Sequence, residues 1–451
     1  MTNLRVVKFY SPWHVRSCNV HHPTSFESFS DESGSLEWNG YPFKSLPLNF
    51  YPEKLVEHSM PNSHVMKLWR PVQDYVNSKR ISLGRSKQSM DLLDFSKAQE
   101  IEWEGICFCE SFCNVDPHIL SLSMTVALNF VRSKYSKTLH SEGNFRSLRN
   151  FDVSFCFSVK EFSLSSKEIS DLDLLTSNSK ILYSSIGSLS ELRRIILGGS
   201  RLEILPINEL CCLRSFEERN LSDCRQMNQS PKLHVLFDAL FDLQELFMAG
   251  CSDFFEVPDI IGTYSSLKYL GLKGSCIDSL PASIKNLPLL KAIYLRNCRR
   301  LLSIPQLPPS IMHLDATNCT SLENIFTITT SAPQQDDILS YFFLFVNCLK
   351  LDEHSLCNIM DNAYLSLKRA VLNNLEASVF CYPSNRAPEW FRCNQTRGAS
   401  MSMQLSPAVD ELLGFVFCTV LPQFTPNEIC PTYVKCSCCF EDVLYTHCRR
   451  G

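Results

Sequence analysis

The chain has 451 residues, a formal net charge of −4 and a hydrophobic fraction of 45%. This length allows one long repeat array followed by a further domain, with enough apolar residues for both cores. The small net charge gives no general attraction to nucleic acid or to an anionic membrane.

The N-terminal segment lacks the apolar core of a signal peptide. The longest apolar runs, Tyr341–Val346 and Leu412–Leu421, are much shorter than the roughly 20 residues of a membrane-spanning helix. We therefore expect a protein of the cytoplasm or nucleus, with its 22 cysteines reduced.

A pattern of nearly constant period runs through the first three quarters of the chain. Apolar residues recur at relative positions 1, 4 and 6, and a small polar residue or a cysteine usually follows at position 9. The units begin at Leu55, Ser78, Ile101, Thr125, Leu148, Ile169, Leu192, Leu213, Leu243, Leu267, Leu290 and Ile311. Two weaker units precede them, at Leu4–Phe9 and Ser33–Trp38. The steps are 21 to 24 residues, with one of 30 after Leu213, and this period is typical of leucine-rich repeats.

The spacing within each unit predicts a short strand with one buried face. In the unit of Leu267, Leu270 and Leu272 should be buried, whereas Tyr269, Gly271 and Lys273 should face solvent. Stacked strands make a continuous core, and the residue at position 9 can pair with backbone groups in the following turn. Leu-Pro and Ile-Pro pairs, as at Pro281, predict an irregular or 3₁₀ backbone on the convex side. The early units are degenerate, since His58 and Glu104 occupy position 4 of theirs.

Two segments make the resemblance more specific than a generic repeat protein. Between Leu36 and Trp69 the distinctive residues are Trp38, Gly40-Tyr41-Pro42, Lys44-Ser45-Leu46-Pro47, Phe50, Pro52-Glu53-Lys54-Leu55-Val56, Met60-Pro61 and Leu68-Trp69. This segment resembles the opening of the leucine-rich-repeat domain in plant intracellular nucleotide-binding disease resistance proteins of the Toll/interleukin-receptor class. The segment from Pro305 to Leu322 resembles the last repeats of the same receptors.

After Ile325 the repeat pattern no longer matches. We expect a helix capped by Asp352, with Leu356, Ile359, Met360, Ala363 and Leu367 on its apolar face. Short strands should follow, around Val379, Met401–Leu405, Leu412–Leu421 and Tyr433–Phe440. Phe342–Leu351, Cys381-Tyr382-Pro383, Pro388-Glu389-Trp390-Phe391 and Leu413-Gly414-Phe415 resemble motifs of the C-terminal jelly-roll/Ig-like domain of the same receptors. In that family the sandwich continues beyond the position of Gly451, so we expect it to be incomplete here.

The predicted fold class is therefore α/β. Residues 1–325 should form a leucine-rich-repeat solenoid with parallel strands on its concave face, and residues 326–451 a truncated antiparallel β-sandwich. The resemblance implies the sensing and autoinhibitory part of a receptor, which binds a pathogen effector protein and the nucleotide-binding switch domain of a full-length receptor. No phosphate-loop motif is present, and we expect no enzyme activity, cofactor, nucleic-acid partner or membrane partner.

Alternative functions stay open at this point. A substrate adaptor of a ubiquitin ligase predicts an N-terminal adaptor-binding helical module, and none precedes Leu4. A secreted repeat receptor would need a signal peptide. The cluster of Cys430, Cys436, Cys438, Cys439, His447 and Cys448 allows a zinc site, but the strand alternation of Cys436–Cys439 favours free thiols.

The candidates for partner binding are strand residues that should face solvent, since aromatic and arginine side chains often anchor interfaces. They are Gln244, Glu245, Phe247, Lys268, Tyr269, Lys273, Ala292, Tyr294 and Arg296, with Trp390 added from the C-terminal motif. Phe247 and Tyr294 matter most, because large aromatic rings there would lie in solvent without a partner. Arg193, Arg194, Arg299 and Arg300 lie on or just after strands and fit either a solvated rim or part of the same surface.

Overall fold

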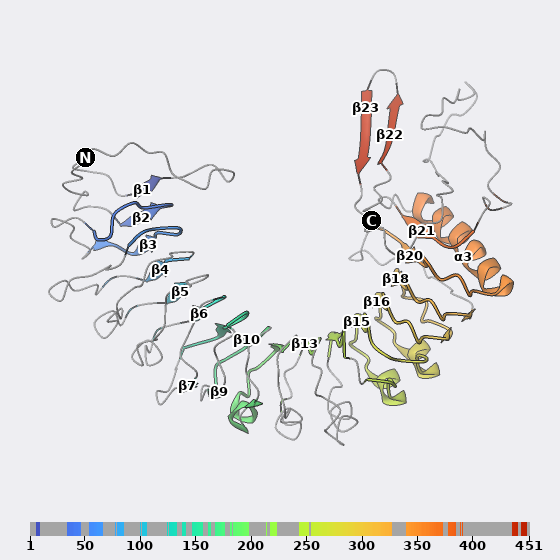
Figure 1. Ribbon diagram of the computed structural model, residues 1–451, viewed down its shortest axis with the longest axis horizontal. Helices are drawn as coiled ribbons and strands as arrows, with labels where there is room; N and C mark the ends of the chain where they lie inside the picture. Colours follow the sequence, from blue (N-terminus) through green and yellow to red (C-terminus); the bar gives the residue numbers. More distant parts are fainter. Residues whose placement is uncertain are drawn as a thin grey trace. The chain divides into compact units, whose positions relative to one another are not determined.

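The computed structural model describes the repeat strands, their turns, one long helix and a C-terminal hairpin (Figure 1). The described residues are 6–9, 34–46, 54–65, 77, 79–84, 100, 102–105, 124, 126–132, 138–140, 147–156, 161–163, 167–175, 181–182, 184–197, 213, 217–222, 243–251, 254–326, 340–372, 378–384, 388, 390, 435–440 and 443–448. The chain divides into two compact units, Met1–Pro383 and Ser384–Gly451.

The first unit is built on one parallel sheet of 16 strands, each hydrogen-bonded to the next along the chain. Its strands are β1 (Val6–Phe9), β2 (Ser35–Trp38), β3 (Glu57–Ser59), β4 (Arg80–Ser82), β5 (Trp103–Gly105), β6 (Ala127–Asn129), β8 (Asn150–Asp152), β10 (Asp171–Asp173), β12 (Arg194–Ile196), β13 (Glu218–Asn220), β14 (Glu245–Phe247), β15 (Tyr269–Gly271), β16 (Ala292–Tyr294), β18 (His313–Asp315), β20 (Phe342–Leu344) and β21 (Val379–Cys381). Such stacking of single-strand repeats is the architecture of a leucine-rich-repeat solenoid. The first part of the predicted fold class is confirmed.

The strand register confirms the predicted frame in eleven of the twelve units. In those units the residue at position 4 lies directly opposite its counterpart in the neighbouring strands. His58 and Glu104 hold these inward register positions, so the degenerate early repeats were framed correctly. His58 is buried beside Met60, and burial lowers the pKa of its imidazole to about 4.

The frame of the unit assigned to Leu213 was wrong by three residues. Arg219, not Phe216, pairs with Ile195 on one side and Leu246 on the other. The unit therefore begins at Phe216, and the apparent steps of 21 and 30 residues become 24 and 27. Arg219 is buried at the inward position. A search that accepts only apolar residues at position 4 rejects Arg219 and assigns the repeat to the nearest apolar residue instead.

The prediction that the repeats end after Ile325 was also wrong. β20 pairs in parallel with β18, and β21 pairs in parallel with β20. Phe343 and Phe345 supply the two buried positions of a further repeat that begins at Ser340. The compact first unit accordingly ends at Pro383, well past the expected boundary between residues 325 and 326. The interval of 29 residues from Ile311 to Ser340 exceeds every correctly framed step among the twelve main units, which hides this repeat from a search at fixed period.

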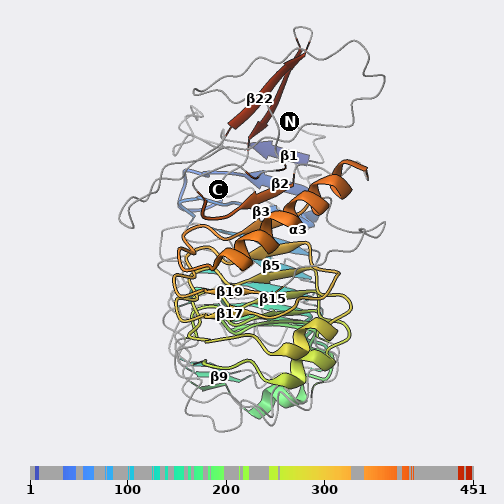
Figure 2. The same ribbon diagram turned by 90° about the vertical axis from the view of Figure 1, so that its right-hand side faces the viewer.

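Short 3₁₀ helices and small sheets lie on the side opposite the main sheet (Figures 1 and 2). The helices are η3 (Ser184–Ser188), η5 (Asp259–Thr263) and η6 (Ala282–Asn286), and the small parallel sheets are β7 (Thr138–His140) with β9 (Glu161–Ser163) and β11 (Ile181–Leu182), and β17 (Ser303–Ile304) with β19 (Asn324–Ile325). Pro258 and Pro281, both extended, immediately precede η5 and η6. This agrees with the expectation that proline keeps this side short and irregular.

Turns after the strands follow a common plan. The residue at position 8 has a positive φ, which favours glycine or asparagine, as at Gly274 (φ 68°) and Asn297 (φ 64°). At position 9 a buried cysteine thiol donates to a backbone carbonyl of the preceding repeat. Examples are Cys298 to Leu272 O at 3.0 Å and Cys319 to Leu295 O at 3.1 Å. The predicted role of position 9 is thereby confirmed in these repeats.

Helix α3 (Glu353–Leu372) closes the small sheet of β17 and β19. As predicted, Asp352 caps it, since Asp352 Oδ1 accepts the Ser355 N–H at 2.7 Å. Ser355 Oγ accepts the backbone N–H of Ile325 at 2.8 Å, and Asn358 Nδ2 donates to the Ile325 carbonyl at 3.3 Å. Two helix side chains thus pair with edge groups of the last short strand.

The buried face of α3 differs from the predicted one. Ile359 and Ala363 are buried, but Leu356, Met360 and Leu367 are only half-buried. The remaining buried positions belong to Ser355, Asn362, Ser366 and Ala370. Small polar side chains let the helix approach the sheet closely, and this contact is invisible to a search for apolar periodicity.

Among the described residues that carried the N-terminal resemblance, Trp38, Tyr41, Leu46, Leu55 and Met60 are buried in the core. The Trp38 ring lies 4.1 Å from that of Phe9 and 5.1 Å from that of Tyr41, measured between centroids. Tyr41 in turn contacts Phe43 and donates its hydroxyl to Ser45 O at 3.0 Å. These residues tie the first repeats together, so their role in this structure is packing.

The second unit is described only in part. Strands β22 (Lys435–Phe440) and β23 (Val443–Cys448) form an antiparallel hairpin, in agreement with the strand predicted at Tyr433–Phe440. The strands predicted at Met401–Leu405 and Leu412–Leu421 lie outside the described residues.

Candidate protein-binding surface

We use the term strand face for the side of the main sheet that carries positions 3, 5 and 7 of each repeat, together with the residue at position 2 that precedes each strand. In its earlier part, charged side chains pair between neighbouring repeats. The ion pairs are Lys8–Glu37, Arg80–Glu57, Lys79–Glu102, Arg193–Glu217 and Arg194–Glu218, with N–O distances of 2.8 to 3.7 Å. Exposed pairs of this kind stabilise by only about 0–1 kcal/mol. They nevertheless neutralise this part of the strand face from within the chain.

The later part of the strand face carries a row of four aromatic rings that spans five repeats. The Phe247 and Tyr294 rings lie 6.4 Å apart, Tyr294 and His313 4.9 Å, and His313 and Phe342 5.4 Å, measured between centroids. We call these four residues the aromatic row. All four are only half-buried, so each presents part of its ring to solvent.

Gly271 makes the first contact of the row possible. It lies between Phe247 and Tyr294 in the strand register. Phe247 leans across it, and a Cβ atom at residue 271 would overlap Phe247 Cδ1. Since Gly271 is buried under this ring, the prediction that it faces solvent was wrong.

A cavity of about 310 Å³ opens beside the row. It is lined by Phe247, Ala249, Gly271, Lys273, Tyr294, Arg296 and Asp315. Arg296 Nε donates to Asp315 Oδ2 at 3.0 Å, and Asp315 Oδ1 also accepts the Thr317 N–H at 3.0 Å. The walls are therefore aromatic, and the rim is a fixed ion pair together with the exposed Lys273.

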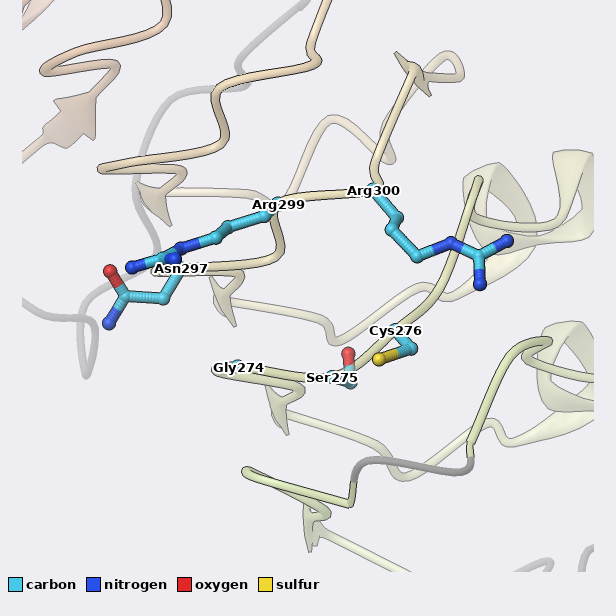
Figure 3. A pocket seen from close by; sticks show the side chains of 6 residues that line it. All are labelled: Gly274, Ser275, Cys276, Asn297, Arg299 and Arg300. Carbon is cyan, nitrogen blue, oxygen red and sulfur yellow. The ribbon is translucent and has the colours of Figure 1, made fainter.

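A second cavity of about 350 Å³ lies at the turns of the repeats that begin at Leu267 and Leu290 (Figure 3). It is lined by Gly274, Ser275, Cys276, Asn297, Arg299 and Arg300. In Figure 3 Arg299 extends toward Asn297, whereas Arg300 points the other way. Arg300 forms a two-point ion pair with Asp278, at 3.0 and 3.2 Å, and its guanidinium lies 5.4 Å from the centre of the Phe255 ring.

Further acidic side chains lie on the strand face before the aromatic row and at its beginning. Burial is the main reason that the pKa of Asp173 is raised to about 6. A hydrogen bond from the Leu175 N–H opposes this shift, and the neighbouring Asp152 adds to it. Burial also raises the pKa of Glu245, with Glu218 as the next cause. Tyr294 has a raised pKa chiefly because it is half-buried. These groups are restrained by the fold, and none is paired as a nucleophile with a base.

The structure brings four of the predicted partner-binding residues together around one cavity. Phe247, Lys273, Tyr294 and Arg296 line it. Glu245 and Tyr269 face each other on β14 and β15, two residues before Phe247 and Gly271, and Lys268 donates to Gln244 Oε1 at 2.9 Å beside them. Trp390 belongs to the second compact unit and is half-buried there.

One predicted surface residue does not belong to the surface. Ala292 is fully buried, because its small side chain lies between Tyr269 and His313 in the register of the sheet. Conversely, His313, Asp315 and Phe342 contribute to the surface and were missed. Positions 3 and 5 of the unit of Ile311 would have identified the first two. Phe342 required the repeat at Ser340.

Within the residues that the structure describes, no group of three or more His, Cys, Asp or Glu side chains could hold a metal ion. The side chains of the hairpin cysteines lie outside that description, so the zinc alternative is not tested.

Comparison with curated proteins relates the chain to plant immunity. It is 27% identical to the disease resistance-like protein DSC1 of Arabidopsis thaliana over 90% of this chain and 38% of that protein. It is also 27% identical to the disease resistance proteins RPS4B and RPS4 of the same plant, over 93% and 95% of this chain and 34% and 35% of theirs. The chain is a homologue of plant disease resistance proteins. The resemblance identified from its sequence is thereby confirmed.

This homologue spans between a third and two fifths of the length of these relatives. No protein-family model matches it. Among solved structures, a leucine-rich-repeat protein of Leptospira interrogans is similar with a TM-score of 0.48 and 18% identity, covering 71% of this chain and 91% of that one. No helix within the described part of the chain is long and apolar enough to cross a membrane.

Proposed function

We propose that this chain is the ligand-sensing part of a plant disease resistance receptor, which recognises a pathogen effector by protein–protein binding and acts in the cytoplasm or nucleus. The aromatic row is the observation that carries the proposal. Four half-exposed rings in contact across five repeats would be an unusual feature on a surface that binds nothing. Aromatic residues are also enriched at interface hot spots. The disease resistance homologues support the same role.

The proposal includes a resting role. In a full-length receptor the strand face or its neighbouring turns would contact the nucleotide-binding switch domain and hold it off until an effector binds. The C-terminal residues, including Trp390, would complete the binding surface as part of a jelly-roll/Ig-like β-sandwich. We propose recognition and no catalytic function for these residues. None of the relatives reported above is named as a ubiquitin-ligase adaptor.

The test is a binding screen of the purified chain against a panel of purified pathogen effectors by biolayer interferometry. Tyr294→Ala should weaken the binding of any captured effector by roughly 5- to 150-fold, since a hot-spot residue contributes about 1–3 kcal/mol. Arg80→Ala, on the charge-paired part of the strand face, is the matched surface control and should leave binding unchanged. If captured effectors bind the Tyr294 variant as tightly as the parent chain, the strand face is not the recognition surface.

A further inference from the structure

The charges around the aromatic row are not balanced by the chain itself. Four cations line the two cavities, namely Lys273, Arg296, Arg299 and Arg300. Asp315 neutralises Arg296 and Asp278 neutralises Arg300. Within the described part of the chain, neither Lys273 nor Arg299 has a carboxylate in ion-pair distance. Both side chains are exposed.

This arrangement contrasts with the charge-paired part of the same face. There, Arg80, Arg193 and Arg194 each contact a carboxylate of a neighbouring repeat. The strand register would allow an ion pair between neighbouring repeats here as well. Lys273 and Arg296 hold equivalent positions on adjacent repeats, next to the Gly271–Tyr294 pair. The nearby carboxylate of Asp315 is already taken up by Arg296 and by the Thr317 N–H.

The two unpaired cations flank one continuous surface. Lys273 follows β15 on the rim of the strand-face cavity. Arg299 extends toward Asn297, which directly follows Arg296 of the same rim (Figure 3). Neighbouring strands are roughly 4.8 Å apart, so a single extended segment can reach the aromatic walls and both cations.

We propose that the repeats beginning at Leu267 and Leu290 bind an acidic segment of the partner protein. An apolar side chain of the segment contacts Phe247 and Tyr294, and carboxylates beside it pair with Lys273 and Arg299. A basic segment is repelled by the same cations, because Asp315 and Asp278 are engaged within the chain and Glu245 is not part of the lining of either cavity. This inference rests on the proposed function, protein recognition by the strand face, and adds the chemistry of the partner.

The experiment selects a displayed library of random peptides on the immobilised full chain. The enriched peptides should combine Asp or Glu with an aromatic or aliphatic residue. For the best of them, the double variant Lys273→Glu/Arg299→Glu should weaken binding by at least about tenfold, since each exposed pair contributes up to about fivefold and reversal adds repulsion. Raising NaCl from about 50 mM to about 500 mM should weaken binding to the parent chain far more than to the double variant.

The matched control is Lys285→Glu, an exposed charge reversal on η6, on the other side of the same repeat array. It should leave binding unchanged. All variants should share the melting temperature of the parent chain, since the substituted side chains are exposed. Lys273→Ala/Arg299→Ala provides a second pair of substitutions without introduced repulsion and should still weaken binding about fivefold or more.

The outcomes separate this inference from the proposed function. Enriched peptides that are neutral or basic, or acidic ones indifferent to both double variants, overturn the inference. In that case strand-face recognition still stands if Tyr294→Ala abolishes their binding. If no enriched peptide depends on Tyr294, both proposals fail. Binding of an oligouridine probe that is lost in the double variant, without acidic peptides, would identify nucleic acid as the partner class and would also overturn the inference.

Discussion

Replacing Gly271 by alanine should separate the packing of the aromatic row from the stability of the solenoid. The new Cβ would overlap Cδ1 of Phe247 and lie 3.1 and 3.3 Å from its Cε1 and Cγ, closer than the roughly 3.5–4.0 Å of a favourable carbon contact. The ring must leave its rotamer, at about 0.5–1.5 kcal/mol, and lose its contact with Tyr294, worth about 0.5–1.5 kcal/mol. Removing a strand glycine returns about 0.5–1 kcal/mol. We expect a net destabilisation of about 1 kcal/mol, measured by urea unfolding.

A double-mutant cycle tests the reasoning. In a Phe247→Ala chain the new methyl group meets no ring, so Gly271→Ala should there stabilise by about 0.5–1 kcal/mol. Gly271→Ala alone should also weaken the binding of any partner that uses the aromatic row. Equal effects of Gly271→Ala in both backgrounds would refute the idea that Phe247 covers this glycine.

Four further predictions concern the core, the titrating groups and the helix. Leu295→Asp should destabilise by about 3–5 kcal/mol in thermal melts, because it buries a carboxylate at a fully buried site; a variant as stable as Tyr294→Ala would mean that the register is wrong by one residue. Burial lowers the pKa of His58 from 6.5 to about 4, so the unfolded state binds a proton that the folded state does not. The free energy of unfolding should therefore fall by on the order of 3 kcal/mol as the pH is lowered from about 6.5 to about 4. In His58→Leu this acid-dependent loss should be smaller. The pKa of Asp173 is raised from 3.8 to about 6, so its carboxylate costs stability once the pH rises from about 4 to about 6. Asp173→Asn should therefore stabilise the protein by about 1 kcal/mol at pH 7, after allowance for solvent screening, and by little near pH 4. Ser355→Ala should cost about 1–3 kcal/mol, because it leaves the Ile325 N–H without its acceptor, and hydrogen exchange at Ile325 should accelerate.

Local spacing was sufficient to predict most of the repeat array. The alternation of positions 4 and 6 with their neighbours is a property of one short strand, and the turn at position 9 depends on the few residues that follow it. Eleven of twelve frames could therefore be assigned without knowledge of any contact. The same reasoning identified the helix after Asp352, its cap and the solvent-facing candidates Phe247, Tyr294 and Arg296.

The errors occurred where a neighbouring element decides the outcome. Arg219 occupies an inward position that apolar spacing cannot recognise, and the repeat at Ser340 follows an interval longer than any correctly framed step among the twelve main units. Gly271 and Ala292 stand at outward positions yet are buried, because larger side chains on adjacent strands cover them. Burial on a sheet surface depends on the partner strand as well as on the strand itself.

The sequence alone determined that this protein is a stack of single-strand repeats with one face available to solvent, since period and alternation are local properties of the chain. Only the tertiary structure decided which part of that face carries contacting aromatic rings and, among the described residues, cations without an ion pair. The ion pairs that neutralise its earlier part, the contact of Phe247 with Tyr294 across Gly271, and the unpaired state of Lys273 beside the Arg296–Asp315 pair all join residues about 20 or more positions apart. Their proximity follows from strand register, which is set by the packing of whole repeats on one another.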